Sequence, residues 1–281
     1  MRLIRSAHEL AAAAGRLKRR GRRIGLVPTM GCLHQGHASL IRRAAADNDA
    51  VIVTIFVNPL QFGPQEDFRR YPRRFRQDCA IARQAGADMI FAPSVAELYP
   101  PGFQTAVQVG PLAARWEGQR RPGHFQGVAT VVTILFGLAL PTRAYFGQKD
   151  YQQTLVVRQL VRDLRLPLAI RQLPTIREAD GLAMSSRNVY LTPRQRARAP
   201  ALYAALRVAR ARIAAGQRQA EPILGAMRRR LRQAGLRVDY VAIVDANTLE
   251  PRTRLRGRVA VLGAAWIGRT RLIDNLLVGV S

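Results

Sequence analysis

Residues 50–57 are the feature that most constrains the fold. This run, Ala-Val-Ile-Val-Thr-Ile-Phe-Val, is almost wholly apolar and rich in β-branched side chains. Such a composition is typical of a strand that is covered on both faces of a parallel sheet. Another strand is predicted over residues 23–27, and residues 38–45 between the two have the apolar spacing of a helix. The three segments form a βαβ unit, so the chain is expected to contain a parallel sheet.

The alternation of helices and strands continues along the chain. Ser6 and Glu9 have the spacing of a capping box and open a helix that ends near Gly21. Further helices are predicted over residues 67–85, 128–140 and 152–164, and further strands over residues 89–91, 144–146 and 168–173. This order predicts an α/β fold, a Rossmann-like doubly wound parallel sheet, in which ligands bind beyond the carboxyl ends of the strands.

The pattern changes after residue 175. Two helices rich in arginine and alanine are predicted over residues 193–215 and 221–234, and strands over 238–244, 258–266 and 270–275. We therefore expect a larger Rossmann-like domain over residues 1–175 and a smaller α+β domain over residues 176–281.

The chain is strongly basic, with a formal net charge of +27. Such a charge suggests a nucleic acid or another anionic partner. However, the arginines are dispersed along the chain, no aromatic base-stacking motif accompanies them, and Lys18 and Lys149 are the only lysines. Nucleic-acid binding is not expected as the main function, although a basic RNA-binding protein is the alternative from a different functional class.

Cysteines and apolar runs indicate the compartment. Cys32 and Cys79 are too few for a disulfide framework or a zinc cluster. No segment resembles a secretory signal, and the apolar run 128–140 is shorter than the roughly 20 residues of a membrane span. A cytoplasmic protein without a membrane partner is expected.

The loop after the strand at 23–27 holds His34 and His37 with Gly31 and Gly36. A helix begins there, and backbone N–H groups at a helix N-terminus attract phosphate, to which imidazoles can donate hydrogen bonds. The alternative is that the two histidines are helix caps or metal ligands. The H-x-G-H sequence is similar to the ATP motif of nucleotidylyltransferases and class I aminoacyl-tRNA synthetases, in which a second basic loop follows downstream.

Polar residues also follow other predicted strands. Asn58 and Gln61 come after residues 50–57, where their amides can bind a hydroxyl or a carboxylate, although a turn with a capping Asn is the simpler interpretation. Lys149 follows the strand at 144–146, and a lysine in a chain that otherwise uses arginine suggests a compact charge for phosphate.

Several longer motifs occur in one order along the whole chain: 28–37, 55–62, Arg-Pro-Gly-His-Phe at 121–125, 146–153, 177–188 and Arg-Leu-Ile-Asp-Asn at 271–275. Together they resemble the pantoate–β-alanine ligases, also called pantothenate synthetases. The resemblance implies condensation of pantoate with β-alanine in coenzyme A biosynthesis. ATP is converted to AMP and pyrophosphate through a pantoyl adenylate, and a homodimer is implied.

The same resemblance implies roles for individual residues. ATP would contact Met30, Gly31, Cys32, Leu33, His34, Gln35, Gly36, His37, Gly147, Gln148, Lys149, Asp150, Ile176, Met184, Ser185, Ser186 and Arg187. The catalytic group would comprise His34, His37, Lys149, Ser185, Ser186 and Arg187, with His37 as proton donor. Gln61 and Gln153 would bind pantoate, with Asn58 beside them, and Asp78 matches a Mg²⁺-associated position. Gln148 replaces the usual glutamate of the family, and activity is expected to survive this change.

A related alternative is a nucleotidylyltransferase of the same fold that transfers a nucleotide to a phosphate ester. The smaller domain, which carries the serine-rich second loop, is expected to close over the active site.

Overall fold

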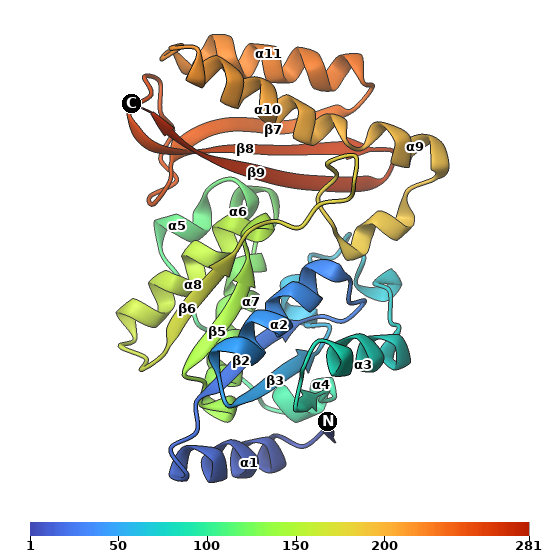
Figure 1. Cartoon of the computed structure of the whole chain (residues 1–281), viewed down its shortest axis with the longest axis vertical. Helices are drawn as coiled ribbons and strands as arrows, with labels where there is room; N and C mark the ends of the chain where they lie inside the picture. Colours follow the sequence, from blue (N-terminus) through green and yellow to red (C-terminus); the bar gives the residue numbers. More distant parts are fainter. Residues whose placement is uncertain (281) are drawn as a thin grey trace. The chain divides into compact units, whose positions relative to one another are not determined.

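The computed structural model describes residues 1–280. Contacts between residues divide the chain into two compact units. Figure 1 shows the chain, coloured from the N-terminus to the C-terminus. The first unit comprises Met1–Gly147 and Gln152–Pro174, and the second comprises Gln148–Tyr151 and the chain from Thr175 onward. The short segment Gln148–Tyr151 thus groups with the second unit, although the chain on both sides of it belongs to the first.

The first unit contains a parallel sheet of six strands. They are β1 (Arg2–Ile4), β2 (Ile24–Thr29), β3 (Ala50–Ile55), β4 (Met89–Phe91), β5 (Arg143–Gly147) and β6 (Ala169–Leu173), in the spatial order β1-β4-β3-β2-β5-β6. All neighbouring pairs are parallel. The chain runs from β2 toward one edge and from β5 toward the other, which is the doubly wound arrangement that the sequence predicts.

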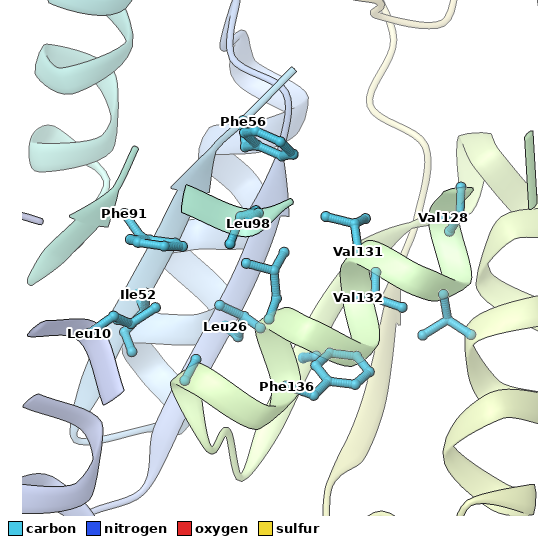
Figure 2. Packing of buried hydrophobic residues seen from close by; sticks show 14 of the residues in the cluster. Leu10, Leu26, Ile52, Phe56, Phe91, Leu98, Val128, Val131, Val132 and Phe136 are labelled. Atoms are coloured by element: carbon cyan, nitrogen blue, oxygen red, sulfur yellow. The ribbon is translucent and has the colours of Figure 1, made fainter. Parts of the chain in front are cut away.

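Helices cover both faces of this sheet. The longer ones are α1 (Ala7–Arg19), α7 (His124–Ala139) and α8 (Tyr151–Asp163) on one face, and α2 (Gln35–Asp47) and α3 (Phe75–Gln84) on the other. Leu26 and Ile52 belong to the same buried cluster as Val132 and Phe136 of α7 (Figure 2), whereas Val27 packs with the α2 side. Neighbouring strand residues therefore contribute to two different cores, which explains the unbroken apolar runs.

Several boundaries differ from the prediction. The helix predicted from residue 67 begins only at Phe75, because Pro72 lacks an N–H group and restricts the residue before it. The helix predicted from residue 128 already begins at His124, after Gly123 in a left-handed conformation. Strand β1 was not predicted.

Short helices connect the main elements. They are α4 (Val95–Leu98), α5 (Pro111–Ala114) and α6 (Glu117–Arg120), with 3₁₀ turns η1 (Pro59–Gln61), η2 (Phe68–Arg70), η3 (Gln148–Asp150) and η4 (Ser186–Tyr190). Within residues 1–280, no helix combines the length and the apolar character that a membrane crossing requires.

The second unit contains an antiparallel sheet of β7 (Arg237–Asp245), β8 (Gly257–Ile267) and β9 (Thr270–Val280). Helices α9 (Pro193–Arg198), α10 (Ala201–Ala214) and α11 (Ala220–Gln233) precede it. Apolar residues of α10 and α11, such as Leu206 and Met227, share one core with Val259 and Val261 of β8. The single helix predicted over residues 193–215 is interrupted near Pro200, but the α+β class of this unit is confirmed.

Candidate active site

Three predicted site segments follow adjacent strands of the first unit. Strand β2 lies between β3 and β5, and the chain leaves β2 and β5 in opposite directions. Open α/β sheets bind ligands at such a switch point, beyond the carboxyl ends of the strands. The loop 30–37 follows β2, Gln61 lies just beyond β3, and Gln153 lies in the first turn of α8 after β5. The topology therefore places the candidate residues where this fold binds ligands.

The two histidines of the loop cap helix α2. The Nδ1 atom of His34 accepts a hydrogen bond from the Gly36 N–H at 3.1 Å, and the Nδ1 atom of His37 accepts one from the His34 N–H at 3.3 Å. The rings lie 4.1 Å apart between centroids. The two histidines therefore act as helix caps, which was the alternative to phosphate binding; capping does not prevent the rings from also binding phosphate.

Capping also determines which ring nitrogen of His34 and His37 carries the proton. A backbone N–H can only donate, so Nδ1 of His34 and of His37 must act as an acceptor. In the neutral ring the proton then lies on Nε2. Each neutral ring thus has its N–H on Nε2, near a helix N-terminus where the backbone favours an anion. This arrangement suits recognition of phosphate oxygens.

Asp78 lies behind the same loop and is only 1% exposed. One carboxylate oxygen accepts from the Leu33 N–H at 2.7 Å and the other accepts from the Cys32 N–H at 3.0 Å. Burial raises the pKa of Asp78 above its usual range, and these two N–H groups oppose that rise. The side chain holds the backbone of the loop in place.

A magnesium ion held through Asp78 does not fit this geometry. Both carboxylate oxygens already accept backbone hydrogen bonds, and the group is almost completely enclosed. No group of three or more His, Cys, Asp or Glu side chains suited to a metal ion occurs within residues 1–280. We therefore assign no chemical step to a metal at this residue.

Asn58 supports the segment that carries Gln61. It is 1% exposed, and its side-chain oxygen accepts hydrogen bonds from the Leu60 N–H at 3.2 Å and the Tyr99 hydroxyl at 2.8 Å. Its amide nitrogen donates to the Gly127 carbonyl at 3.0 Å. The simpler interpretation, a capping Asn in a turn, therefore describes Asn58, whose amide is already used within the protein.

Gln61 differs from Asn58 in this respect. It is 9% exposed, yet no hydrogen bond ties its carboxamide to another residue in the described part of the chain. Its backbone is fixed: the N–H donates to Asn58, and the carbonyl accepts from Arg121 and His124. Because its amide atoms keep some solvent access, the carboxamide can bind a ligand. Gln61 is therefore suited to bind a polar ligand.

The Arg-Pro-Gly-His-Phe motif supplies two residues to this support. Arg121 makes a two-point contact with Glu66, at 2.8 and 2.6 Å, and its third nitrogen lies 3.0 Å from Nε2 of His124. Because the Gln61 carbonyl can only accept, Nδ1 of His124 carries the proton, and Nε2 accepts from Arg121. His124 is therefore neutral. Burial, assisted by the Arg121 charge, lowers the pKa of His124 to about 4.

His124 and Arg121 had no role in the sequence-based site. The motif was visible, but their target is a backbone carbonyl 63 residues away from His124, which no local pattern encodes. Gln153 was predicted to bind pantoate, and this assignment stays a prediction. Like Gln61, it has a carboxamide without a hydrogen-bonding partner among the residues that the structure describes.

The second unit carries the remaining candidates on two segments. Ile176 and Met184 close a short hairpin, because the Met184 N–H donates to the Ile176 carbonyl at 3.0 Å. Ser185 then caps η4 through the Arg187 N–H, and Ser186 is 9% exposed. The second loop predicted from sequence is thus an ordered turn.

Lys149 lies on the other segment, next to Gly147 at the end of β5. Its Nζ atom lies 3.3 Å from a carboxylate oxygen of Asp150, and its side chain is 20% exposed. Gln148 precedes it within η3. A lysine at such a turn provides a compact positive charge for phosphate.

Known proteins are similar to this chain over nearly its whole length. A family model for pantoate-beta-alanine ligase matches residues 2–277. The pantothenate synthetase of Moorella thermoacetica is 52% identical over 282 residues, covering 100% of this chain and 99% of that protein.

Solved structures agree over the same length. The pantothenate synthetase of Thermus thermophilus has a TM-score of 0.94 and 51% identity, covering 98% of this chain and 99% of that chain. The pantoate-beta-alanine ligase of Francisella tularensis, crystallised with beta-gamma ATP and beta-alanine, has a TM-score of 0.82 and 35% identity, covering both chains completely. This chain belongs to the pantoate–β-alanine ligase family.

Proposed function

We propose that this chain condenses pantoate with β-alanine at the expense of ATP, through a pantoyl adenylate. The proposal depends mainly on one observation: two histidines follow β2, and a glutamine that can bind a polar ligand follows the adjacent strand β3. In their neutral capping form, His34 and His37 carry the ring proton on Nε2 at a helix N-terminus, and the Gln61 carboxamide makes no hydrogen bond to another residue within residues 1–280. The family is one of ATP-dependent ligases.

In the first step, a carboxylate oxygen of pantoate attacks the α-phosphorus of ATP. A new bond joins that oxygen to phosphorus, and the bond from phosphorus to the bridging oxygen breaks, so that pyrophosphate leaves with the electron pair. Two anions must approach each other, and charge grows on the leaving group. We assign the Nε2–H groups of His34 and His37 to the triphosphate, and Gln61 and Gln153 to pantoate.

In the second step, the free amine of β-alanine attacks the acyl carbon of the adenylate. An amide bond forms, AMP leaves with the electron pair of the acyl–oxygen bond, and the amine gives up a proton. The reaction needs no covalent protein nucleophile, since the mixed anhydride already activates the acyl group. What the protein contributes is position and exclusion of water.

Residues of the second unit take nucleotide roles in this proposal. Lys149 and Arg187 would supply positive charge to the phosphates, while Ser185 and Ser186 would donate hydrogen bonds. The exposed side chain of Ile176, at 36%, offers an apolar surface to the base. We also propose a homodimer, which light scattering can test.

The direct test is a reconstituted assay with ATP, Mg²⁺, pantoate and β-alanine, in which each component is omitted in turn. We expect AMP and pantothenate only in the complete mixture. Pantoate should also support exchange of labelled pyrophosphate into ATP without β-alanine. A nucleotidylyltransferase would instead need a phosphate ester to exchange pyrophosphate into ATP. RNA binding at physiological salt, without formation of AMP, would indicate that the protein is an RNA-binding protein.

Gly36→Ala is expected to impair ATP use. A Cβ atom at this position would lie 2.8 Å from Cε1 of His34, so the ring must move from its capping position. We expect kcat/KM for ATP to fall on the order of tenfold, ~1.4 kcal/mol of transition-state stabilisation. Gly15→Ala is the matched control, because its Cβ would make only an ordinary contact, 3.4 Å from Arg19. Unchanged ATP kinetics in Gly36→Ala would contradict the role of the His34 ring.

Gln61→Ala is expected to weaken pantoate selectively. Loss of a buried amide donor or acceptor should cost ~1–3 kcal/mol, which raises the KM for pantoate on the order of 10- to 100-fold. The KM for ATP should change little, because the loop after β2 does not depend on this side chain. Steady-state kinetics with each substrate varied will measure both values. Gln84→Ala, at the exposed end of α3, is the control. An equal effect on both substrates would argue against a pantoate contact.

A further inference from the structure

Asn275 lies on β9, in the Arg-Leu-Ile-Asp-Asn motif, and is only 2% exposed. Its side-chain nitrogen donates to the Gln148 carbonyl at 2.8 Å and to the Lys149 carbonyl at 3.0 Å. Its side-chain oxygen lies 3.3 Å from Nε2 of Gln148, which donates to it. One asparagine thus satisfies two consecutive carbonyl groups of the Lys149 segment.

The neighbouring Asp274 anchors the second nucleotide segment. Its two carboxylate oxygens accept from Arg177 at 2.6 and 3.0 Å, and one of them also accepts from the Asn275 N–H at 2.8 Å. Arg177 follows Ile176 directly, donates to the Gly181 carbonyl at 3.2 Å, and lies 3.7 Å above the ring centre of Tyr203. This ion pair is almost fully enclosed, with Asp274 4% exposed.

We propose that Asn275 is a positioning residue for Lys149, and that Asp274 holds the Ile176–Met184 hairpin on the same strand through Arg177. The proposal rests on the assignment of Lys149 to ATP phosphate. Two segments that are separate in sequence would then be carried on one rigid strand, so that their nucleotide contacts keep a fixed relation. The C-terminal motif would serve the site without touching a substrate.

The physical reason lies in the nature of the lysine side chain. Lysine is a flexible point charge, so the place of its ammonium group depends on where its backbone is held. Without the Asn275 amide, the carbonyls of Gln148 and Lys149 lose this side-chain donor, and the turn can relax. Displacement of a charged group by about 1 Å can reduce a rate on the order of 100-fold.

The same contacts give a reason for Gln148. Its amide nitrogen donates to the Asn275 side-chain oxygen, whereas a glutamate in that place has no proton to donate. Gln148 therefore adds a third hydrogen bond between the segment and β9. Gln148, which differs from the usual glutamate of the family, therefore helps to hold the Lys149 segment on β9.

A double-mutant cycle tests the proposal. Asn275→Ala, Lys149→Ala and the double variant are compared by kcat for pantoate-dependent adenylate formation, with folding checked by thermal unfolding. We expect Asn275→Ala to lower kcat on the order of 10- to 100-fold without changing the KM for pantoate. The double variant should be no slower than Lys149→Ala, because Asn275 acts through Lys149. Asn247→Ala, in an exposed turn of the same unit, is the control.

Each other outcome has a distinct meaning. Independent, multiplicative losses, or wild-type kcat in Asn275→Ala, would overturn the positioning role while the ligase function stands. Wild-type kcat in Lys149→Ala would instead overturn the ATP assignment on which the proposal rests. If Asn275→Ala does not fold, the isosteric Asn275→Asp replaces the donor with an acceptor and enters the same cycle. Asp274→Asn is expected to raise the KM for ATP and to leave the KM for pantoate unchanged. A KM that rises for pantoate alone would contradict the proposed role of Asp274 in holding the Ile176–Met184 hairpin.

Discussion

His37→Ala should reduce the rate of adenylate formation on the order of 100- to 1000-fold, equivalent to ~3–4 kcal/mol. The Nε2–H donor of His37 is held at the N-terminus of α2 because its Nδ1 accepts from the His34 backbone. A donor fixed in this way needs no rearrangement when negative charge develops on the leaving pyrophosphate. Alanine removes both the donor and the cap.

The two losses can be separated by measurement. Removal of a cap costs ~1 kcal/mol of stability, which thermal unfolding will report. Pyrophosphate exchange reports adenylate formation alone, and the amide-forming step can be followed with added pantoyl adenylate. His8→Ala is the control, because His8 is exposed on α1. If His37→Ala kept near wild-type exchange, its Nε2–H would have no part in the chemistry, and capping would be its whole role.

The fold was predictable because its sheet is buried on both faces. Residues 50–57 are almost wholly apolar because neighbouring side chains enter two cores: Ile52 joins the cluster that includes α1 and α7, and Val53 joins the cluster of α2. The family resemblance, the α/β class and the ATP-dependent ligase activity were likewise predicted and are confirmed by the comparisons. Element boundaries at Pro72 and Pro200 were missed, because apolar periodicity alone extends across a proline.

The supporting contacts of the site were not predictable in the same way. Asp78 binds the Leu33 N–H across 45 residues, and Asn275 binds the Gln148 carbonyl across 127 residues. Side chains that bind backbone groups leave no periodic pattern, because any backbone can be their partner. The family resemblance implied a metal role for Asp78, and the sequence left Asn58 open between a ligand contact and a cap; the structure shows hydrogen bonds from both side chains to backbone groups.

Acidification should destabilise the first unit through His124. In the folded protein, burial and the Arg121 charge lower the pKa of His124 to about 4, whereas an unfolded chain has a histidine pKa of about 6.5. Above about pH 6.5 both states are neutral, and the full stability is present. As pH falls from about 6.5 to about 4, the His124 imidazole is protonated in the unfolded state but stays neutral in the folded state. The free energy of unfolding should therefore drop by ~3 kcal/mol across this window.

His124→Asn isolates this contribution. The variant lacks the titrating group, so the difference between its free energy of unfolding and that of the wild type should change by ~3 kcal/mol between pH 7 and pH 4. Denaturant titration at several pH values measures this difference. Asp78 has a raised pKa, so its contribution has the opposite sign, but it is common to both proteins and cancels. His8→Asn, at an exposed position on α1, is the substitution control. A difference that is independent of pH would mean that His124 can accept a proton in the fold, and a neutral His124 between Arg121 and the Gln61 carbonyl would then not be required.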